Sequence, residues 1–355
     1  MSIDKADRPI LITGGCGFIG CNLADRLASQ GCAVKVLDTL ARGGARENAQ
    51  WLKSRHGNRI ELIIADVREP APVMVAARDA QAILHLAAQV AVTDSLVDPV
   101  GDFEINARGT LNVLEAVRLS NIDAPILFAS TNKVYGRLID DRGVFREAER
   151  YVPADPQLAH GISEESPLDF YSPYGCSKGS ADQYVRDYAR VFGLRTVVMR
   201  MSCIYGPRQF GTEDQGWIAH FLLSALRKQP LTIFGDGYQV RDALYVSDAV
   251  DAWLGVLDRA MELGGRIFNL GGGLSNSISL RELINLIADQ TGANLDYSFA
   301  DWRPGDQPWY VSDTRALSKA VGWHPRFRLH EGLTLLNEWL TERFVSPSDK
   351  HEVLA

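Results

Sequence analysis

The beginning of the chain alternates apolar runs with a helical pattern. An apolar run at residues 9–13 ends in glycines, residues 22–29 space their apolar side chains as a helix does, and a second apolar run follows at 33–37. A strand, a helix and a second strand within about thirty residues have the size of a βαβ unit. This pattern predicts two parallel strands joined by a helix.

The same alternation continues to residue 201. Helical segments such as 109–119 and 177–192 separate further short runs that are rich in Ile, Val and Leu. These runs lie at residues 60–66, 82–88, 125–131 and 196–201. Strands that are apolar along their whole length and alternate with helices are typical of a parallel sheet covered on both faces. We therefore expect an α/β fold built on a doubly wound parallel sheet.

The pattern of predicted elements changes after residue 203. Turn-rich segments such as YGPRQFG, GDGYQ and LGGGLSN alternate there with shorter helices and strands. We interpret residues 204–345 as a smaller substrate-binding lobe, with chain crossings between the lobes, and residues 346–355 as a tail. Residues 137–165 are polar, charged and contain proline, so we expect an inserted surface loop or lid, because loops of that length are often functional.

Composition narrows the class of protein. The chain has 355 residues, of which 46% are hydrophobic and 23% charged, and its net charge is −7. An acidic chain argues against broad binding to nucleic acid or to anionic membranes, so an anionic ligand has to be held by a few arginines and backbone amides. The five cysteines form no CxxC pair and no metal-ligand spacing, so we expect free thiols, no metal site and a reducing cytoplasm. The start of the chain is acidic and leads straight into a strand, which does not fit a signal peptide, and no run approaches the ~20 apolar residues of a membrane span.

The turn after the first strand is rich in glycine. Gly14, Gly17 and Gly20 form a GxxGxxG pattern between a predicted strand and a predicted helix. In such a turn one glycine allows a tight bend, another lets a pyrophosphate approach the backbone, and the third lets helix and strand pack closely. The phosphates then bind free N–H groups at the helix N-terminus. The motif predicts a dinucleotide site.

Acidic residues at two strand ends refine this prediction. Asp38 ends the second apolar run, eighteen residues after Gly20. A carboxylate there can accept hydrogen bonds from the adenosine ribose and repels a 2′-phosphate, which favours NAD over NADP, although it can also be a strand-end cap. Arg42 follows and can meet a 2′-phosphate, which weakens this preference. Asp66 and Val67 can flank the adenine, but an Asp that forms a turn is an equally good interpretation of the first.

A tyrosine and a lysine four residues apart supply the candidate chemistry. Tyr174 and Lys178 lie at the start of a predicted helix, where this spacing puts both on one face. A free tyrosine has a pKa near ~10 and is a poor base at neutral pH. A neighbouring ammonium and an oxidised nicotinamide ring both stabilise the phenolate, which can then take a hydroxyl proton while hydride leaves the same carbon.

Polar residues at the end of the strand run 125–131 complete this constellation. Thr131 can hydrogen-bond the reacting oxygen, or it can form a local turn, and Asn132 can contact a sugar hydroxyl. His85 lies in an apolar run without metal-ligand partners nearby, so we interpret it as a structural histidine.

Six segments carry a resemblance to a known family. GGCGFIG, STNKVYG, SPYGCSK, CIYGPRQF, GDGYQVRDALYVSD and FNLGGG together resemble the extended short-chain dehydrogenase/reductase family of nucleotide-sugar enzymes, over residues 8–340. The resemblance implies a Rossmann-type NAD-binding domain over residues 1–203, a nucleotide-sugar-binding lobe over 204–345 and a nucleoside-diphosphate sugar as substrate. It also implies a Thr131–Tyr174–Lys178 catalytic set and a homodimer or homotetramer formed through helix packing.

The resemblance extends to the residues of the two binding sites. The implied cofactor contacts are Gly14, Gly17, Phe18, Ile19, Gly20, Asp38, Arg42, Asp66, Val67, Leu86, Ala87, Ala88, Gln89, Asn106, Ser130, Tyr174, Lys178 and Cys203. The implied substrate contacts are Thr131, Asn132, Tyr174, Gln209, Gln215, Arg241 and Arg303. We place Arg241 and Arg303 on the diphosphate because a guanidinium fork matches phosphate oxygens, with a surface salt bridge as the alternative for each. Trp217, beside Gln215, lines the sugar or base pocket or belongs to the core.

The residues after Thr131 discriminate within the family. Its 4,6-dehydratases carry Asp-Glu there and its decarboxylases usually carry a Glu, whereas this chain has Asn132 and Lys133. Epimerisation by oxidation and re-reduction of one carbon needs no such carboxylate, so we expect an isomerase, a carbohydrate epimerase. The segments STNKVYG, LDFYSPYGCSKGSADQY and FGTEDQGW most resemble the branch that acts at C2 of CDP-sugars. UDP-sugar 4-epimerases, which often carry Asn at the position of Cys203, are the alternative.

Overall fold

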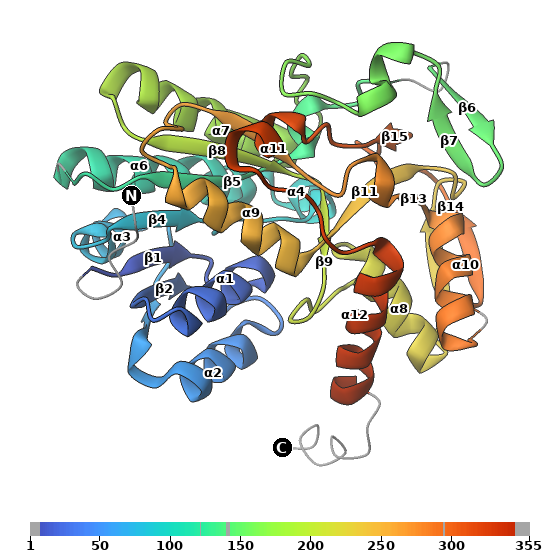
Figure 1. Ribbon diagram of the computed structural model, residues 1–355, viewed down its shortest axis with the longest axis horizontal. Coiled ribbons are helices and arrows are strands. Elements are labelled where there is room, and N and C mark those ends of the chain that lie inside the picture. The colour runs from blue at the N-terminus through green and yellow to red at the C-terminus, as the bar shows by residue number, and fades with distance from the viewer. Residues whose placement is uncertain (1–7, 121, 140–142, 294, 345–355) are drawn as a thin grey trace.

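A seven-stranded parallel sheet forms the centre of the larger lobe (Figure 1). The computed structural model describes residues 8–120, 122–139, 143–293 and 295–344. The order of the strands is β12-β8-β5-β4-β1-β2-β3, and neighbours are parallel throughout. They are β1 (Ile10–Thr13), β2 (Val34–Asp38), β3 (Ile60–Ile64), β4 (Ala82–His85), β5 (Ile126–Thr131), β8 (Thr196–Met201) and β12 (Ile267–Leu270). The chain reverses its direction of travel across the sheet between β1 and β4, which is where such folds bind ligands.

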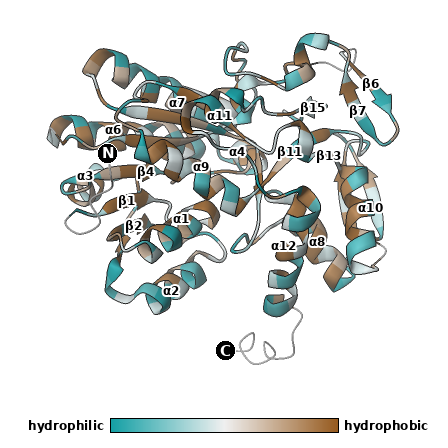
Figure 2. Cartoon of the chain, in the orientation of Figure 1, coloured by the Kyte–Doolittle hydropathy of each residue, from teal (hydrophilic) through white to brown (hydrophobic). Residues whose placement is uncertain are grey.

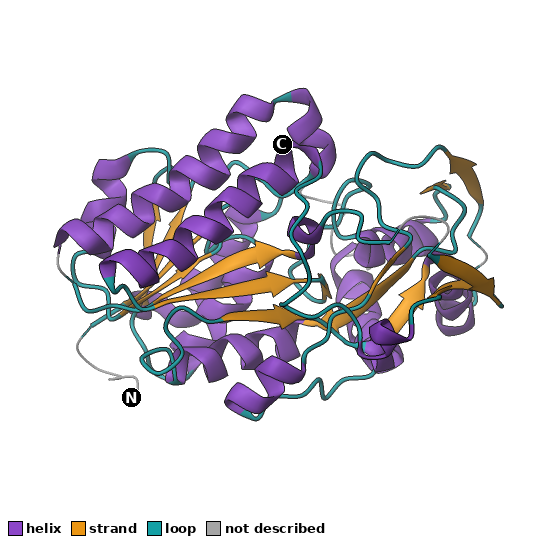
Figure 3. Ribbon diagram, turned by 90° about the horizontal axis from the view of Figure 1, so that it is seen from above, coloured by secondary structure: helices purple, strands orange, loops and turns teal. Residues whose placement is uncertain are grey.

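Helices cover both faces of this sheet (Figure 3). One layer consists of α1 (Phe18–Ser29), α2 (Ala45–His56), α9 (Val246–Asp258) and α11 (Arg315–Val321), whose apolar side chains share a core with β1 and β2. The other consists of α3 (Pro70–Ala77), α6 (Gly109–Ser120) and α7 (Ser172–Phe192). The short helices α4 (Val92–Val97) and α5 (Pro99–Phe103) pack against α7, and a π-helical turn, η2 (Glu104–Arg108), leads from α5 into α6. The predicted doubly wound α/β fold is confirmed.

The smaller lobe has its own core. Apolar residues of α8 (Trp217–Arg227), α10 (Leu280–Thr291) and α12 (Leu329–Phe344) pack together there. Its strands are β9 (Cys203–Tyr205), β10 (Leu231–Phe234), β11 (Val240–Tyr245), β13 (Ser277–Ser279), β14 (Tyr297–Ala300) and β15 (Trp309–Tyr310). Strand β11 pairs with β9, β13 and β15, and β10 pairs with β14. Between these elements the chain crosses back to the larger sheet with α9, β12 and α11.

Hydropathy follows these layers (Figure 2). The strands of the large sheet are brown, whereas α2 and the hairpin of β6 (Val144–Glu147) and β7 (Arg150–Pro153) carry much teal. Burial along β1 and β5 is complete, as expected for strands with a helical layer on each side. No helix among the described residues is both long and apolar enough to cross a lipid bilayer.

The segment 137–165 differs from its expectation. It contains the hairpin β6 (Val144–Glu147) and β7 (Arg150–Pro153) and a 3₁₀ turn, η4 (Pro156–His160), and residues 140–142 lie outside the described residues. The hairpin packs on the smaller lobe, where Arg150 forms an ion pair with Glu282 at 2.7 Å and the Tyr151 N–H donates to Tyr238 O at 2.9 Å. The described part of the segment does not line the cavity presented below, so the expected lid was wrong for these residues.

Candidate functional site

A cavity of about 790 Å³ opens at the carboxyl ends of the parallel strands and extends to the smaller lobe. Its wall includes the glycine-rich turn, the ends of β2, β4 and β5, the start of α7 and the segment that precedes α8. Nearly all site residues expected from the sequence line it; the exception is Asn106. A cavity of this size can enclose ligands with tens of atoms.

The glycine-rich turn packs closely on the neighbouring backbone and leaves the start of α1 without a side-chain cap. Gly14 has φ +67°, and a Cβ there would lie 2.6 Å from the nitrogen of Ala87. A Cβ on Gly20 would lie 2.3 Å from the carbonyl oxygen of Gly14, so only glycine lets α1 pack this closely on the turn. No side chain caps α1, which begins at Phe18, so its first N–H groups face the cavity as an anion site.

The carboxylate of Asp38 is fixed at the end of β2. The N–H of Cys16 donates to its Oδ2 at 3.0 Å, and the N–H of Leu40 donates to its Oδ1 at 2.9 Å. The residue therefore acts as a local cap and also lines the cavity. Asp66 accepts hydrogen bonds from both the backbone and the guanidinium of Arg68, which lower the pKa of this carboxyl. The turn-forming interpretation of Asp66 describes its side chain, although it still lines the cavity beside Val67.

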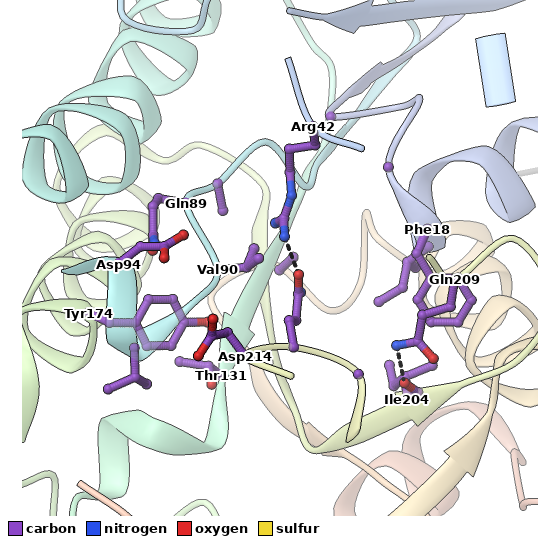
Figure 4. Close-up of a pocket in the computed structure, with 18 of the residues that line it drawn as sticks. Phe18, Arg42, Gln89, Val90, Asp94, Thr131, Tyr174, Ile204, Gln209 and Asp214 are labelled. Carbon is purple, nitrogen blue, oxygen red and sulfur yellow. Dashed lines mark hydrogen bonds between the residues drawn. The ribbon is translucent and has the colours of Figure 1, made fainter. Parts of the chain in front are cut away.

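Tyr174 and Thr131 meet inside the cavity (Figure 4). The phenol end of Tyr174 points toward Thr131. Burial raises the pKa of Tyr174 to about 12, while the Thr131 hydroxyl and the charge of Arg42 act in the opposite direction. Residue 174 lies in the first turn of α7, and its N–H donates to Ser95 Oγ on α4 at 3.2 Å.

Lys178 lies one turn further along α7 and is 3% exposed. Its Nζ donates to the carbonyl oxygen of Ala129 at 2.6 Å and lies 4.3 Å from the ring centre of Phe128. Burial lowers the pKa of this lysine to about 7, against the opposing charges of Asp182 and Asp102. The sequence predicted that its ammonium stabilises the Tyr174 phenolate. In this structure the cation that lowers the pKa of Tyr174 is Arg42, because Lys178 is turned toward Ala129.

The remaining expected cofactor contacts fall into two groups. Leu86, Ala87, Ala88 and Gln89 follow β4 along the cavity wall, and Cys203 lies opposite with its Sγ 3.3 Å from Trp217 Nε1. Ser130 lines the cavity, but its hydroxyl donates to the buried Asp182. Asn106 differs from its expected place as a cofactor contact. It is fully buried behind the cavity wall, where its Oδ1 accepts a hydrogen bond from the N–H of Gln89 at 2.9 Å. It therefore supports a cavity residue instead of lining the cavity.

The expected substrate residues converge on the cavity from both lobes. Asn132 donates to Gln307 at 3.3 Å, and Gln209 donates to the carbonyl oxygen of Ile204 at 3.1 Å. Both Gln209 and Gln89 line the cavity, and within the described chain the buried Oε1 of each has no hydrogen-bond partner.

The two arginines differ in their present partners. Arg241, on β11, is 8% exposed, and its guanidinium donates to Val240 O at 2.8 Å. Arg303 lies over the ring of Phe234, 3.7 Å from its centre, and contacts Asp214 at 3.4 Å. The salt-bridge alternative thus describes the present partner of Arg303, and a diphosphate would have to compete with Asp214 for it. Gln215, next to Asp214, accepts a hydrogen bond from Arg42 (Figure 4).

Two further polar residues lie at the site without having been assigned a role from the sequence. Lys133 donates from Nζ to Gly305 O at 3.0 Å and lies 3.5 Å from Asp306, which joins the Thr131 turn to the loop that carries Arg303. Asp102 is buried behind Tyr174 and bonded to Ser177. Gly305 and Ser177 are more than seventy positions away from Lys133 and Asp102 in the chain, so no local motif could indicate these two contacts. His85, in contrast, is the structural histidine expected, held between Thr13 and Thr110.

Comparison with known proteins agrees with this geometry. The model of the NAD dependent epimerase/dehydratase family matches residues 10–271. The chain is 43% identical to the CDP-paratose 2-epimerase of Salmonella typhi, over 93% of this chain and 98% of that protein. It is 32% identical to a putative UDP-glucose 4-epimerase of Methanocaldococcus jannaschii, over 93% and 98%. Among solved structures, a UDP-glucose 4-epimerase of Thermus thermophilus in complex with NAD matches with a TM-score of 0.78 and 32% identity, covering 94% of this chain and 99% of that one.

Proposed function

The chain belongs to the NAD-dependent epimerase/dehydratase family, and we propose that it is an epimerase that inverts C2 of a CDP-linked sugar. Its cofactor is NAD, which accepts hydride from the reacting carbon and returns it when bound. The residues present fit this group, because the uncapped N-terminus of α1, the close approach at Gly14 and the carboxylate of Asp38 face one continuous cavity. We propose that the cofactor contacts are those expected from the sequence, with Asn106 acting through Gln89.

The observation that carries the proposal is the turn after β5. Thr131 faces the phenol end of Tyr174, and the next two residues, Asn132 and Lys133, place an amide and an ammonium where an elimination would need carboxylates. The amide of Asn132 faces Gln307, and the ammonium of Lys133 faces Gly305 O and Asp306. Together with Tyr174, this turn therefore keeps the groups that can hold and move one hydroxyl proton.

The chain's own residues divide the work as follows. Tyr174 takes the proton of the ring hydroxyl and later returns it, and Thr131 holds the same oxygen. Lys178 supplies positive charge at the base of the site. Arg241 and Arg303 hold the diphosphate, so that the sugar can turn between its two faces without leaving the cavity. Gln209 and Gln215 contribute polar contacts on the side of the smaller lobe.

One incubation separates the proposed substrate from its alternative. The NAD-loaded protein is given CDP-sugars and UDP-sugars separately, and the products are identified by NMR. We expect inversion at C2 of a CDP-sugar with no net consumption of NAD. Inversion at C4 of a UDP-sugar without any C2 inversion would replace the proposal with the UDP-sugar 4-epimerase function, which the similarity to UDP-glucose 4-epimerases favours as second candidate. A requirement for stoichiometric NADH would contradict both.

We further propose that the protein is a homodimer or homotetramer and works in a reducing cytoplasm. Apolar side chains are exposed along adjoining helices of the larger lobe, as on surfaces that bind another protein. They are Leu96, Val97, Val100, Phe103, Leu119, Tyr184, Val191 and Phe192. The free thiols support the compartment, because such an environment keeps cysteines reduced. Sedimentation analysis of the purified protein measures its oligomeric state, and a monomer at micromolar concentration would contradict that part.

A further inference from the structure

Behind the catalytic helix lies a buried carboxylate that the proposed reaction does not use. Asp102, on α5, is 1% exposed. Ser177, on α7, donates from its hydroxyl to Asp102 Oδ2, and Asn106 donates from its amide to Asp102 Oδ1 at 3.1 Å. Within the described part of the chain, Asp102 forms no ion pair at hydrogen-bond distance. A buried carboxylate without a bonded cation is expensive, so its presence calls for a role.

The hydrogen-bond donors around Asp102 suit a carboxylate. The N–H of Gln89 donates to Asn106 Oδ1, which fixes the amide of Asn106 with its NH₂ group toward Asp102 and Ser177. Ser177 Oγ accepts from that NH₂ group at 3.0 Å, and its own proton can go to Asp102 Oδ2 or to the carbonyl oxygen of Tyr174 at 3.2 Å. Both oxygens of Asp102 thus face donors, which suits a carboxylate. Burial raises the pKa of Asp102, whereas the Ser177 hydroxyl and the charge of Lys178 lower it.

The charge of Asp102 acts on the catalytic pair. Helix α5 packs on α7 beside Tyr174 and Lys178, and the negative charge raises the pKa of both residues. Burial, in contrast, lowers the pKa of Lys178 to about 7. A second carboxylate, Asp182, also faces Lys178, but it is bound on both oxygens by Arg200 at 2.9 Å.

Two other titratable groups, His85 and Asp98, lie near Lys178 and Asp102. His85, on β4, is fully buried with a pKa lowered to about 3, so it is neutral and adds no charge at physiological pH. On the far side of Asp102, the exposed Asp98 acts on its carboxyl group from the start of α5. Asp102 is thus the anion near Lys178 that no arginine neutralises by direct contact.

We propose that Asp102 is a positioning residue whose negative charge keeps the amino group of Lys178 protonated during the reaction. This inference rests on the proposed function, in which Lys178 supplies positive charge at the base of the site. A lysine in apolar surroundings loses its proton readily, and a neutral amine supplies no such charge. Asp102 would therefore set the upper pH limit of the reaction without touching substrate or cofactor.

The direct test measures the lysine itself. The NAD-loaded protein is prepared with isotope-labelled lysine, the signal of Lys178 is assigned by its loss in Lys178→Arg, and its titration is followed by NMR. Asp102→Asn keeps the shape of the side chain and removes its charge. We expect it to lower the titration midpoint of Lys178 by about one pH unit, as for the loss of a nearby opposite charge. Asp98→Asn, which removes the same charge at an exposed position and keeps a good helix cap, should leave the midpoint in place.

The pH profile of the reaction gives a second readout. Because Asp102 raises the pKa of both members of the pair, Asp102→Asn should shift both limbs of the kcat profile to lower pH, and kcat above the upper limb should fall about tenfold. Ser177→Ala, which removes a hydrogen bond but no charge, should leave the limbs in place. An unmoved Lys178 midpoint, or a profile that is lower at every pH without a shift, would overturn the proposal. A shifted midpoint in a protein that epimerises no CDP-sugar would support the role of Asp102 and refute the proposed function.

Discussion

Individual charged side chains contribute unequally to the free energy of unfolding. Asp182 and Arg200 are both almost completely buried and form two hydrogen bonds of 2.9 Å, and Ser130 adds a third bond to Asp182. Removing one partner of such a pair leaves the other charge buried without compensation. We expect Asp182→Ala to lower the free energy of unfolding by about 3–5 kcal/mol, measured by urea denaturation. The exposed pair of Asp123 and Arg195 is the control, and Asp123→Ala should cost less than about 1 kcal/mol. Equal losses in the two variants would contradict this account.

Tyr174 is the residue whose loss should separate binding from chemistry. Tyr174→Phe keeps the buried ring and removes the hydroxyl that faces Thr131. We expect kcat to fall by about 10²- to 10⁴-fold, the usual contribution of a general base, while KM and retained NAD change little. Tyr184→Phe on the same helix, half exposed and outside the cavity, should behave as wild type. Steady-state kinetics with NAD content as a second measurement checks both, and a variant that loses only affinity would show that the hydroxyl serves binding.

At the scale of elements, the turn between β1 and α1 is the most tightly constrained junction. A Cβ on Gly20 would lie within 2.7 Å of both Gly14 O and Gly15 Cα, which are backbone atoms that cannot move aside cheaply. We expect Gly20→Ala to displace α1 from β1 and to reduce the NAD that remains bound after purification. Gly264→Ala, where the nearest atom would be 3.5 Å away, is the matched control. Full retention of NAD in Gly20→Ala would contradict this account of the turn.

The elements also show which features of the structure can be predicted from the sequence. The glycine turn and the pair Tyr174–Lys178 were predictable because each depends on spacing within one local element. Strands predicted as 60–66 and 82–88 end earlier, at Ile64 and His85, because the chain there leaves the sheet to line the cavity. Contacts between distant segments were not predictable: the direction of the Lys178 amine depends on Ala129, and Asn106 was assigned to the cavity although it lies behind Gln89.

At the scale of the whole molecule, a hydrogen bond from Arg42 crosses the cavity between the lobes. Arg42, from the segment after β2, donates to Gln215 in the segment before α8 (Figure 4). Within the smaller lobe, Arg303 holds the neighbouring Asp214. Residues 213–216 thus connect the cofactor side of the cavity to the loop that carries Arg303, which we propose binds the diphosphate of the substrate. An epimerase that reuses one NAD per active site benefits from such a closure, because the cofactor must stay bound through both hydride transfers.

Arg42→Leu should therefore loosen the hold on NAD. A hydrogen bond with a charged partner contributes about 1.5–3 kcal/mol, so its loss should speed the release of NAD by about tenfold or more. The measurement is the exchange of bound NAD for a labelled excess. Arg46→Leu, an exposed arginine four residues further on that does not line the cavity, is the control for a lost surface charge. If Gln215→Leu speeds release as Arg42→Leu does, and the double variant adds little, the two residues act as one connection. Additive effects would mean that Arg42 holds NAD directly and that Gln215 acts on its own.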